Sequence, residues 1–174
     1  MTVQQPIVYA GSYAARATST GSPAYAYKNL STPLTELYYD GRFQVISQGI
    51  GERLARPLQD GRERFDLLDL PATATASSPT TTRVTGVSTS GPIVSTGSWH
   101  ELEVHALING NSSLVEVWLD GTNVITKTAE ALGTTGVGRI YIGDTSTGLT
   151  FDSRFDNQIV STSSDISPRR RRRT

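Results

Sequence analysis

Apolar and polar residues alternate along much of this chain, which is the pattern of β-strands that bury one face. The clearest segments are Glu36–Ser47, Ser98–Leu107 and Leu114–Asp120. In each of them one face is mostly apolar, while the other carries charged, polar and aromatic side chains. Asn109-Gly110-Asn111 separates the last two segments and predicts a turn that pairs them as a hairpin.

Shorter strands are expected on both sides of this hairpin. Asp120-Gly121 is a strong turn signal before a further strand at Val124-Ile125, because glycine adopts positive φ angles without a steric clash. The other expected strands are Ile7–Tyr9, Ser12–Thr18, Ala24–Lys28, Gly138–Gly143 and Phe151–Ser161. Eight or more short strands at this spacing predict an all-β fold, a two-sheet antiparallel β-sandwich.

Residues from about 50 to 82 break the alternation. Gly51–Leu70 is dense in charge, and Pro57 makes a long helix there unfavourable, although Arg62–Leu70 suits a short one. Pro71–Thr82 is a low-complexity stretch. Three explanations stay open for this irregular insertion: a long excursion between sheet strands, a flexible insertion, or strands replaced through a frame change in the coding sequence.

The composition narrows the class of protein. Serine, threonine and glycine make up one third of the chain, lysine occurs twice and cysteine never, which disfavours helical bundles and disulfide scaffolds. The formal net charge of zero is a sum of two unlike parts, because Arg169 to Arg173 balance a net charge of −5 on residues 1–168. We therefore expect an acidic domain with a flexible basic tail, no specific nucleic-acid partner and no membrane insertion.

One face of the predicted strands combines aromatic rings with charged groups. Aromatic rings stack on sugar faces, and carboxylates accept hydrogen bonds from sugar hydroxyl groups. If the 36–47 strand lies in the same sheet as the hairpin, eight residues form a candidate sugar-binding face: Trp99, Glu101, Glu103, His105, Glu116, Trp118, Tyr38 and Arg42. The alternative is that the two tryptophans only pack at sheet edges or under loops.

Four strand motifs follow one another in Gly97–Ser161. They are W-x-x-x-x-V from Trp99, V-x-V-W-x-D-G from Val115, I-x-I-G from Ile140 and D-x-x-x-V from Asp156. In this order they resemble the concanavalin A-like lectin/glucanase superfamily, specifically its LamG-like jelly-roll modules. The resemblance covers roughly residues 7–48 and 83–164 and implies a jelly-roll fold without implying a particular activity.

The resemblance also implies a calcium site, which this sequence matches only in part. Such modules often hold a structural calcium ion between an acidic first strand and the aspartate of the last strand. Met1–Pro6 contains no acid, so Asp156 and Asp152 remain as a partial site for an optional Ca²⁺. The alternative is that Asp156 caps a turn or pairs with an arginine, and no cofactor is required.

Glycosidases of this superfamily carry three acids in the order E-x-D-x-x-E on one strand. Glu101 and Glu103 have the first spacing, but Ala106 occupies the third position. His100 and His105 fall on opposite faces of their strand and cannot share a metal ion there. The sequence therefore favours a protein that is not an enzyme.

These observations predict a jelly-roll domain over residues 1–164, with the insertion at about 50–82, and a flexible arginine-rich tail over 165–174. The expected function is a non-catalytic carbohydrate-binding or adhesion module of a bacterial secreted or cell-surface protein, with a polysaccharide or glycan as partner. The chain starts without a signal peptide, so this location follows from the resemblance. Two alternatives are a structural module that self-associates without a small ligand, and a polysaccharide hydrolase or lyase.

Overall fold

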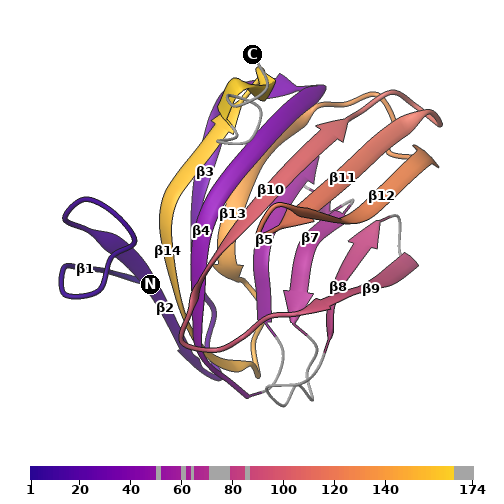
Figure 1. The fold of residues 1–174 in the computed structure, drawn as a ribbon. Coiled ribbons are helices and arrows are strands. Elements are labelled where there is room, and N and C mark those ends of the chain that lie inside the picture. The colour runs from indigo at the N-terminus through magenta and orange to yellow at the C-terminus, as the bar shows by residue number, and fades with distance from the viewer. Residues whose placement is uncertain (50–51, 60–61, 64, 71–78, 85–86, 167–174) are drawn as a thin grey trace.

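The computed structural model describes the backbone of residues 1–49, 52–59, 62–63, 65–70, 79–84 and 87–166, and the side chains of residues 1–49 and 89–166. Within these ranges the strands form two antiparallel sheets of seven strands each (Figure 1). The first sheet contains, in spatial order, β1 (Thr2–Gln4), β2 (Ala14–Thr20), β14 (Thr150–Ser161), β4 (Glu36–Gln48), β10 (Trp99–Leu107), β11 (Ser113–Leu119) and β12 (Thr122–Glu130). The predicted all-β sandwich is confirmed.

The second sheet is built from the remaining strands. It contains, in spatial order, β3 (Ala24–Leu34), β13 (Val137–Asp144), β5 (Glu52–Gln59), β7 (Phe65–Leu70), β8 (Pro79–Val84) and β9 (Val87–Ile93), while β6 (Arg62–Glu63) pairs with β5. A single turn of 3₁₀ helix at Ser164–Ile166 follows β14. No helix in the described ranges is long and apolar enough to cross a membrane.

The hydrophobic core lies between the two sheets and uses the apolar face that the alternation predicts. Leu37, Phe43 and Val45 of β4 are at most 2% exposed, and Leu102 and Val104 of β10 are equally buried. The opposite side chains of the same strands therefore lie on the outer face of the first sheet, away from the core.

Within residues 50–82 the described segments 52–59, 62–63, 65–70 and 79–84 are strands of the second sheet, so neither the short helix considered for Arg62–Leu70 nor an irregular insertion describes these segments. β5 pairs with β13 on one side and β7 on the other, even though Pro57 removes one backbone donor in β5. Pairing with neighbouring strands, of which β13 is distant in the sequence, gives this segment its structure, and alternation does not record such pairing. Residues 71–78 lie outside the described residues, and the frame change stays a hypothesis.

The expected strand at Ile7–Tyr9 is also wrong. The backbone N–H groups of Tyr9 and Ala10 donate to Asp156 Oδ2, at 2.8 and 3.1 Å, instead of to a neighbouring strand. A strand forms earlier, at Thr2–Gln4, where it pairs with β2. The first residues therefore form an edge strand and a loop that is tied to β14.

Candidate functional site

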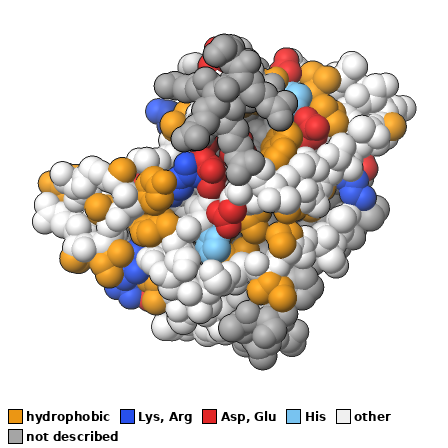
Figure 2. Space-filling model, viewed as in Figure 1, with side chains coloured by type: hydrophobic (Ala, Val, Ile, Leu, Met, Phe, Trp, Pro, Cys, Tyr) orange, Lys and Arg blue, Asp and Glu red, His pale blue; other side chains and the backbone are white. Residues whose placement is uncertain are grey.

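The register of β4, β10 and β11 brings the predicted sugar-binding residues together on the outer face of the first sheet. The neighbouring pairs are Arg42 with Glu101, Asp40 with Glu103, Tyr38 with His105, Glu103 with Trp118, and His105 with Glu116, while Trp99 lies beside Gln44. We call this surface the acid-rich face. Figure 2 shows acidic side chains next to a basic one near the middle of the molecule in this view. The 36–47 strand therefore lies in the same sheet as the hairpin, as the predicted sugar-binding face requires.

Arg42 is the centre of one group of charges on the acid-rich face. Its guanidinium forms a close ion pair with Glu101 and lies 3.7 Å from Asp40. The ring of Tyr9 covers the guanidinium from above, with 5.0 Å between the Arg42 Cζ and the ring centroid. The arginine is therefore committed to protein partners on three sides.

Asp40 lies beneath this group with 5% of its surface exposed. Burial raises the pKa of Asp40 to about 6, because a carboxylate in a poorly solvated position is costly. The positive charge of Arg42 counteracts this rise, while Glu101 and Glu103 add to it. Asp40 therefore changes its charge in mildly acidic solution.

His105 is the centre of a second group. Its Nδ1 lies 3.0 Å from Glu116 Oε2 and its Nε2 lies 2.9 Å from Glu36 Oε1, and both contacts are hydrogen bonds at once only when both nitrogens carry a proton. The ring stacks on Tyr38 with a centroid distance of 4.4 Å and an angle of 1°. Hydrogen bonds from His105 and Tyr38 lower the pKa of Glu36.

The two tryptophans of the acid-rich face have different surroundings. Trp99 packs edge-on against Tyr9, with 5.9 Å between ring centroids. Trp118 is half-buried, lies between Glu103 of β10 and Asn123 of β12, and makes no ring contact with any side chain in residues 1–49 or 89–166. Trp118 therefore differs from Trp99 in having no aromatic neighbour among the described side chains.

The two aspartates of the expected calcium site are used in other ways. Asp152 forms an ion pair with Arg16, and the hydrogen bonds of this pair lower the pKa of Asp152. Asp156 accepts backbone N–H groups of Tyr9, Ala10 and Asn157. These donors do not fit a cation, and the described residues contain no cluster of three or more metal-ligating side chains. The calcium site stays a prediction that these contacts do not support.

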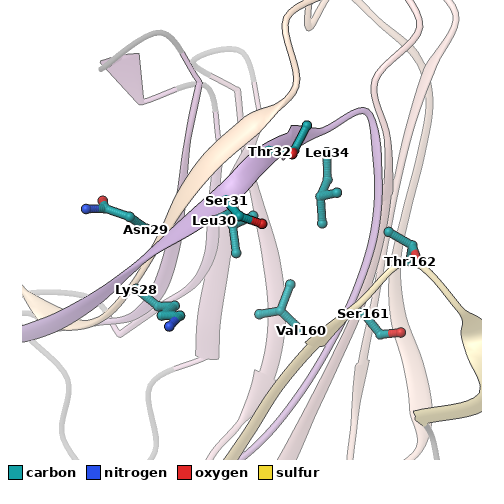
Figure 3. A pocket seen from close by; sticks show the side chains of 9 residues that line it. All are labelled: Lys28, Asn29, Leu30, Ser31, Thr32, Leu34, Val160, Ser161 and Thr162. Atoms are coloured by element: carbon teal, nitrogen blue, oxygen red, sulfur yellow. The ribbon is translucent and has the colours of Figure 1, made fainter.

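A cavity of about 710 Å³ lies away from the acid-rich face, between β3 and the end of β14. Leu30 and Val160 point toward one another across it, and Ser161 and Thr162 line one side, whereas Asn29 points away (Figure 3). No predicted site residue lines this cavity. One wall of it is β3, the edge strand of the second sheet.

No family model and no curated protein matches the chain. The fold resembles an endo-β-1,4-glucuronan lyase from the fungus Trichoderma reesei, at 16% identity and a TM-score of 0.65 over 93% of this chain and 87% of the other. It also resembles the carbohydrate-binding module CBM66 from Bacillus subtilis, at 12% identity and a TM-score of 0.54 over 92% and 91% of the two chains. A PL7 alginate lyase from Zobellia galactanivorans aligns over 86% and 76%, at 12% identity and a TM-score of 0.57.

These similarities show the fold alone. They are consistent with a concanavalin A-like fold and do not show the LamG-like subdivision. The chain therefore shares the expected jelly-roll sandwich with these solved structures. Their likeness assigns no role to the acid-rich face.

Sequence reasoning missed two residues of the acid-rich face. Glu36 lies two positions before Tyr38, so strand alternation already places it on the same face, where it binds His105. Tyr9 carried no such signal, because its position over Arg42 depends on the backbone contacts of its loop with Asp156. The first residue was predictable and the second was not.

Proposed function

We propose that this protein is a non-catalytic carbohydrate-binding module that holds a neutral sugar chain on the acid-rich face. The observation that carries the proposal is Trp118, a half-buried ring without an aromatic partner among the described side chains, beside Glu103 and close to Glu116 and His105. A sugar ring can stack on the indole while its hydroxyl groups donate to the carboxylates.

The charges of the acid-rich face favour a neutral ligand over an acidic one. Of the eight predicted residues, three are acids, and Arg42, the one arginine, is already paired with Glu101. A uronate or sulfated chain would therefore meet like charges. A secreted or cell-surface location in a bacterial protein accords with such a ligand and belongs to the same proposal.

The arrangement supports binding better than catalysis. Arg42 faces Glu101 and Asp40, and His105 faces Glu36 and Glu116, so these titratable groups satisfy one another instead of converging on a common point. The printed names of the similar structures include both polysaccharide lyases and a carbohydrate-binding module. We therefore keep the hydrolase or lyase as an alternative that the experiment tests.

The experiment is a screen of the full chain on a glycan array, followed by affinity electrophoresis in gels that contain the neutral polysaccharides retained. Trp118→Ala is expected to weaken retention at least about tenfold, and Trp118→Phe to keep part of it because a stacking ring remains. Tyr13→Ala is the matched control, since Tyr13 is an exposed ring, 59% accessible, outside this face.

Three results would reject the proposal. They are the absence of any retained neutral glycan, retention that Trp118→Ala leaves unchanged, and release of shortened sugar chains by the wild-type protein. The last result would favour the hydrolase or lyase. Stable oligomers in sedimentation velocity without sugar affinity would favour the self-associating structural module instead.

A further inference from the structure

A second aromatic surface lies on the outer face of the other sheet. Tyr25 and Tyr27 project from β3, and Tyr141 projects from the adjacent strand β13, where it pairs with Tyr27. The three ring centroids are 5.5 to 6.5 Å apart. We call these rings, together with Arg139, the tyrosine platform.

Arg139 gives the tyrosine platform a positive charge. Its guanidinium carbon lies 4.6 Å from the centroid of Tyr27 and 5.8 Å from that of Tyr141. The Nε donates to Asn29 Oδ1, and Nη1 donates to the Tyr141 hydroxyl at 2.9 Å. An arginine has five N–H donors, so the contacts described use two of them and three remain for a ligand.

The tyrosine platform is open to solvent. Tyr25 is 39% exposed and Tyr27 is 54% exposed, and both project from β3, the edge strand of the second sheet. Asn29 beside them is exposed as well and points away from the cavity at the sheet edge (Figure 3). No acid projects from the outward positions of β3 and β13 between Tyr25 and Asn29 or between Arg139 and Gly143.

We infer that the tyrosine platform is a second ligand site, which binds a sugar chain carrying carboxylate groups. The tyrosine rings offer faces on which sugar rings stack, and the guanidinium offers its free donors to a carboxylate in a charge-assisted, bidentate geometry. Asn29 and the tyrosine hydroxyl groups suit the remaining sugar hydroxyls. The site shares no residue with the acid-rich face, so the inference does not depend on the proposed function.

The size of the tyrosine platform favours a sugar chain over a folded protein. A whole tyrosine side chain offers roughly 200 Å² of surface, so Tyr25 and Tyr27 together expose about 200 Å². A stable protein interface needs roughly 800 Å² from each partner. The exposed rings supply a fraction of that area, which suits a few sugar residues.

The test measures binding of glucuronate oligomers and of neutral glucose oligomers of equal length to the full chain by isothermal titration calorimetry. We expect the wild-type protein to prefer the glucuronate oligomer, with an affinity that falls as salt is added. Tyr27→Ala is expected to weaken this binding at least about tenfold. Arg139→Gln is expected to remove the preference for the acidic oligomer, whereas Tyr13→Ala leaves both affinities unchanged.

Trp118→Ala separates this inference from the proposed function. It should leave glucuronate binding unchanged, and Tyr27→Ala should leave retention of neutral glycans unchanged. The inference is overturned if the wild-type protein does not bind glucuronate oligomers, if Trp118→Ala abolishes that binding, or if Tyr27→Ala and Arg139→Gln both fold and bind normally. Concentration-dependent oligomers in sedimentation velocity that Tyr27→Ala disrupts would also overturn it, since the platform would then bind a second copy of the chain.

Discussion

At the scale of single residues, the acid-rich face concentrates charge where little water reaches. Asp40 and Glu103 are 5% and 8% exposed although they lie on the outer side of the sheet. Arg42 offsets part of the resulting repulsion through its contacts with Asp40 and Glu101. The free-energy cost that remains for the buried carboxylate of Asp40 raises its pKa. A substitution of Asp40 therefore tests the balance between burial and charge pairing on this face.

We predict that Asp40→Asn makes the protein more stable relative to the wild type as the pH rises. Asp40 has a pKa of about 6 in the folded protein against an ordinary value of 3.8, so the folded state binds this proton more tightly than the unfolded state does. Its stabilising contribution is complete below pH 3.8 and is lost as the pH rises through about 6. Asparagine does not titrate and keeps a neutral group throughout.

Urea unfolding between pH 4 and 7 checks this prediction. The difference in unfolding free energy between Asp40→Asn and the wild type should grow by up to about 3 kcal/mol across this range. The lowered pKa values of Asp152 and Glu36 act in the opposite direction, but they cancel because both proteins contain these residues. Asp165→Asn, at an exposed position, is the control, and parallel pH profiles for Asp40→Asn and the wild type would contradict the prediction.

At the scale of elements, β4 and β14 fit together through a glycine and a bulge. The pairing of β14 with β4 shifts between Asp156 and Ile159, and this irregularity places Gln158 next to Gly41. The Tyr39 hydroxyl donates to Gln158 Oε1 in the space that a side chain at position 41 would fill. Gly41 is thus required by the packing of these two strands.

Gly41→Ala is predicted to destabilise the sandwich by about 1–3 kcal/mol. The added methyl group would lie 2.5 Å from the Tyr39 hydroxyl and 2.7 Å from Gln158 Oε1, so this partly buried hydrogen bond would have to move. Gly138→Ala is a matched strand control, because its Cβ would have no atom within 4 Å. Thermal or urea unfolding should show a loss for the first variant only, and equal stabilities would contradict the packing argument.

The sequence predicts an element correctly when the pattern of that segment alone determines its structure. The strands at Glu36–Gln48 and Trp99–Leu107 were predictable because alternation itself reflects one buried face. β5 and β7 were not, because pairing across the second sheet decides their structure, and the loop at Tyr9 depends on the distant Asp156. The same holds for the candidate sites: the acid-rich face follows from alternation, whereas the tyrosine platform needed the register between β3 and β13.

At the scale of the whole molecule, the two candidate sites lie on opposite outer faces of the sandwich (Figure 1). The acid-rich face belongs to β4, β10 and β11 of the first sheet, and the tyrosine platform belongs to β3 and β13 of the second. Because the core separates the sheets, one short oligomer cannot reach both sites. Two molecules of a long polysaccharide that contains neutral and uronate residues could, however, bind to one protein molecule, one at each site.

The protein is therefore predicted to cross-link such a polysaccharide. Light scattering of a fixed amount of the polysaccharide should rise as wild-type protein is added. It should fall again in excess protein, because each polysaccharide molecule is then covered by its own protein molecules and is no longer linked to another. Trp118→Ala and Tyr27→Ala should each still bind the polysaccharide through the remaining site without raising the scattering. Tyr13→Ala should behave as the wild type does. A rise in scattering with both single variants would show that cross-linking arises from self-association of the protein and not from two sugar sites on one protein molecule.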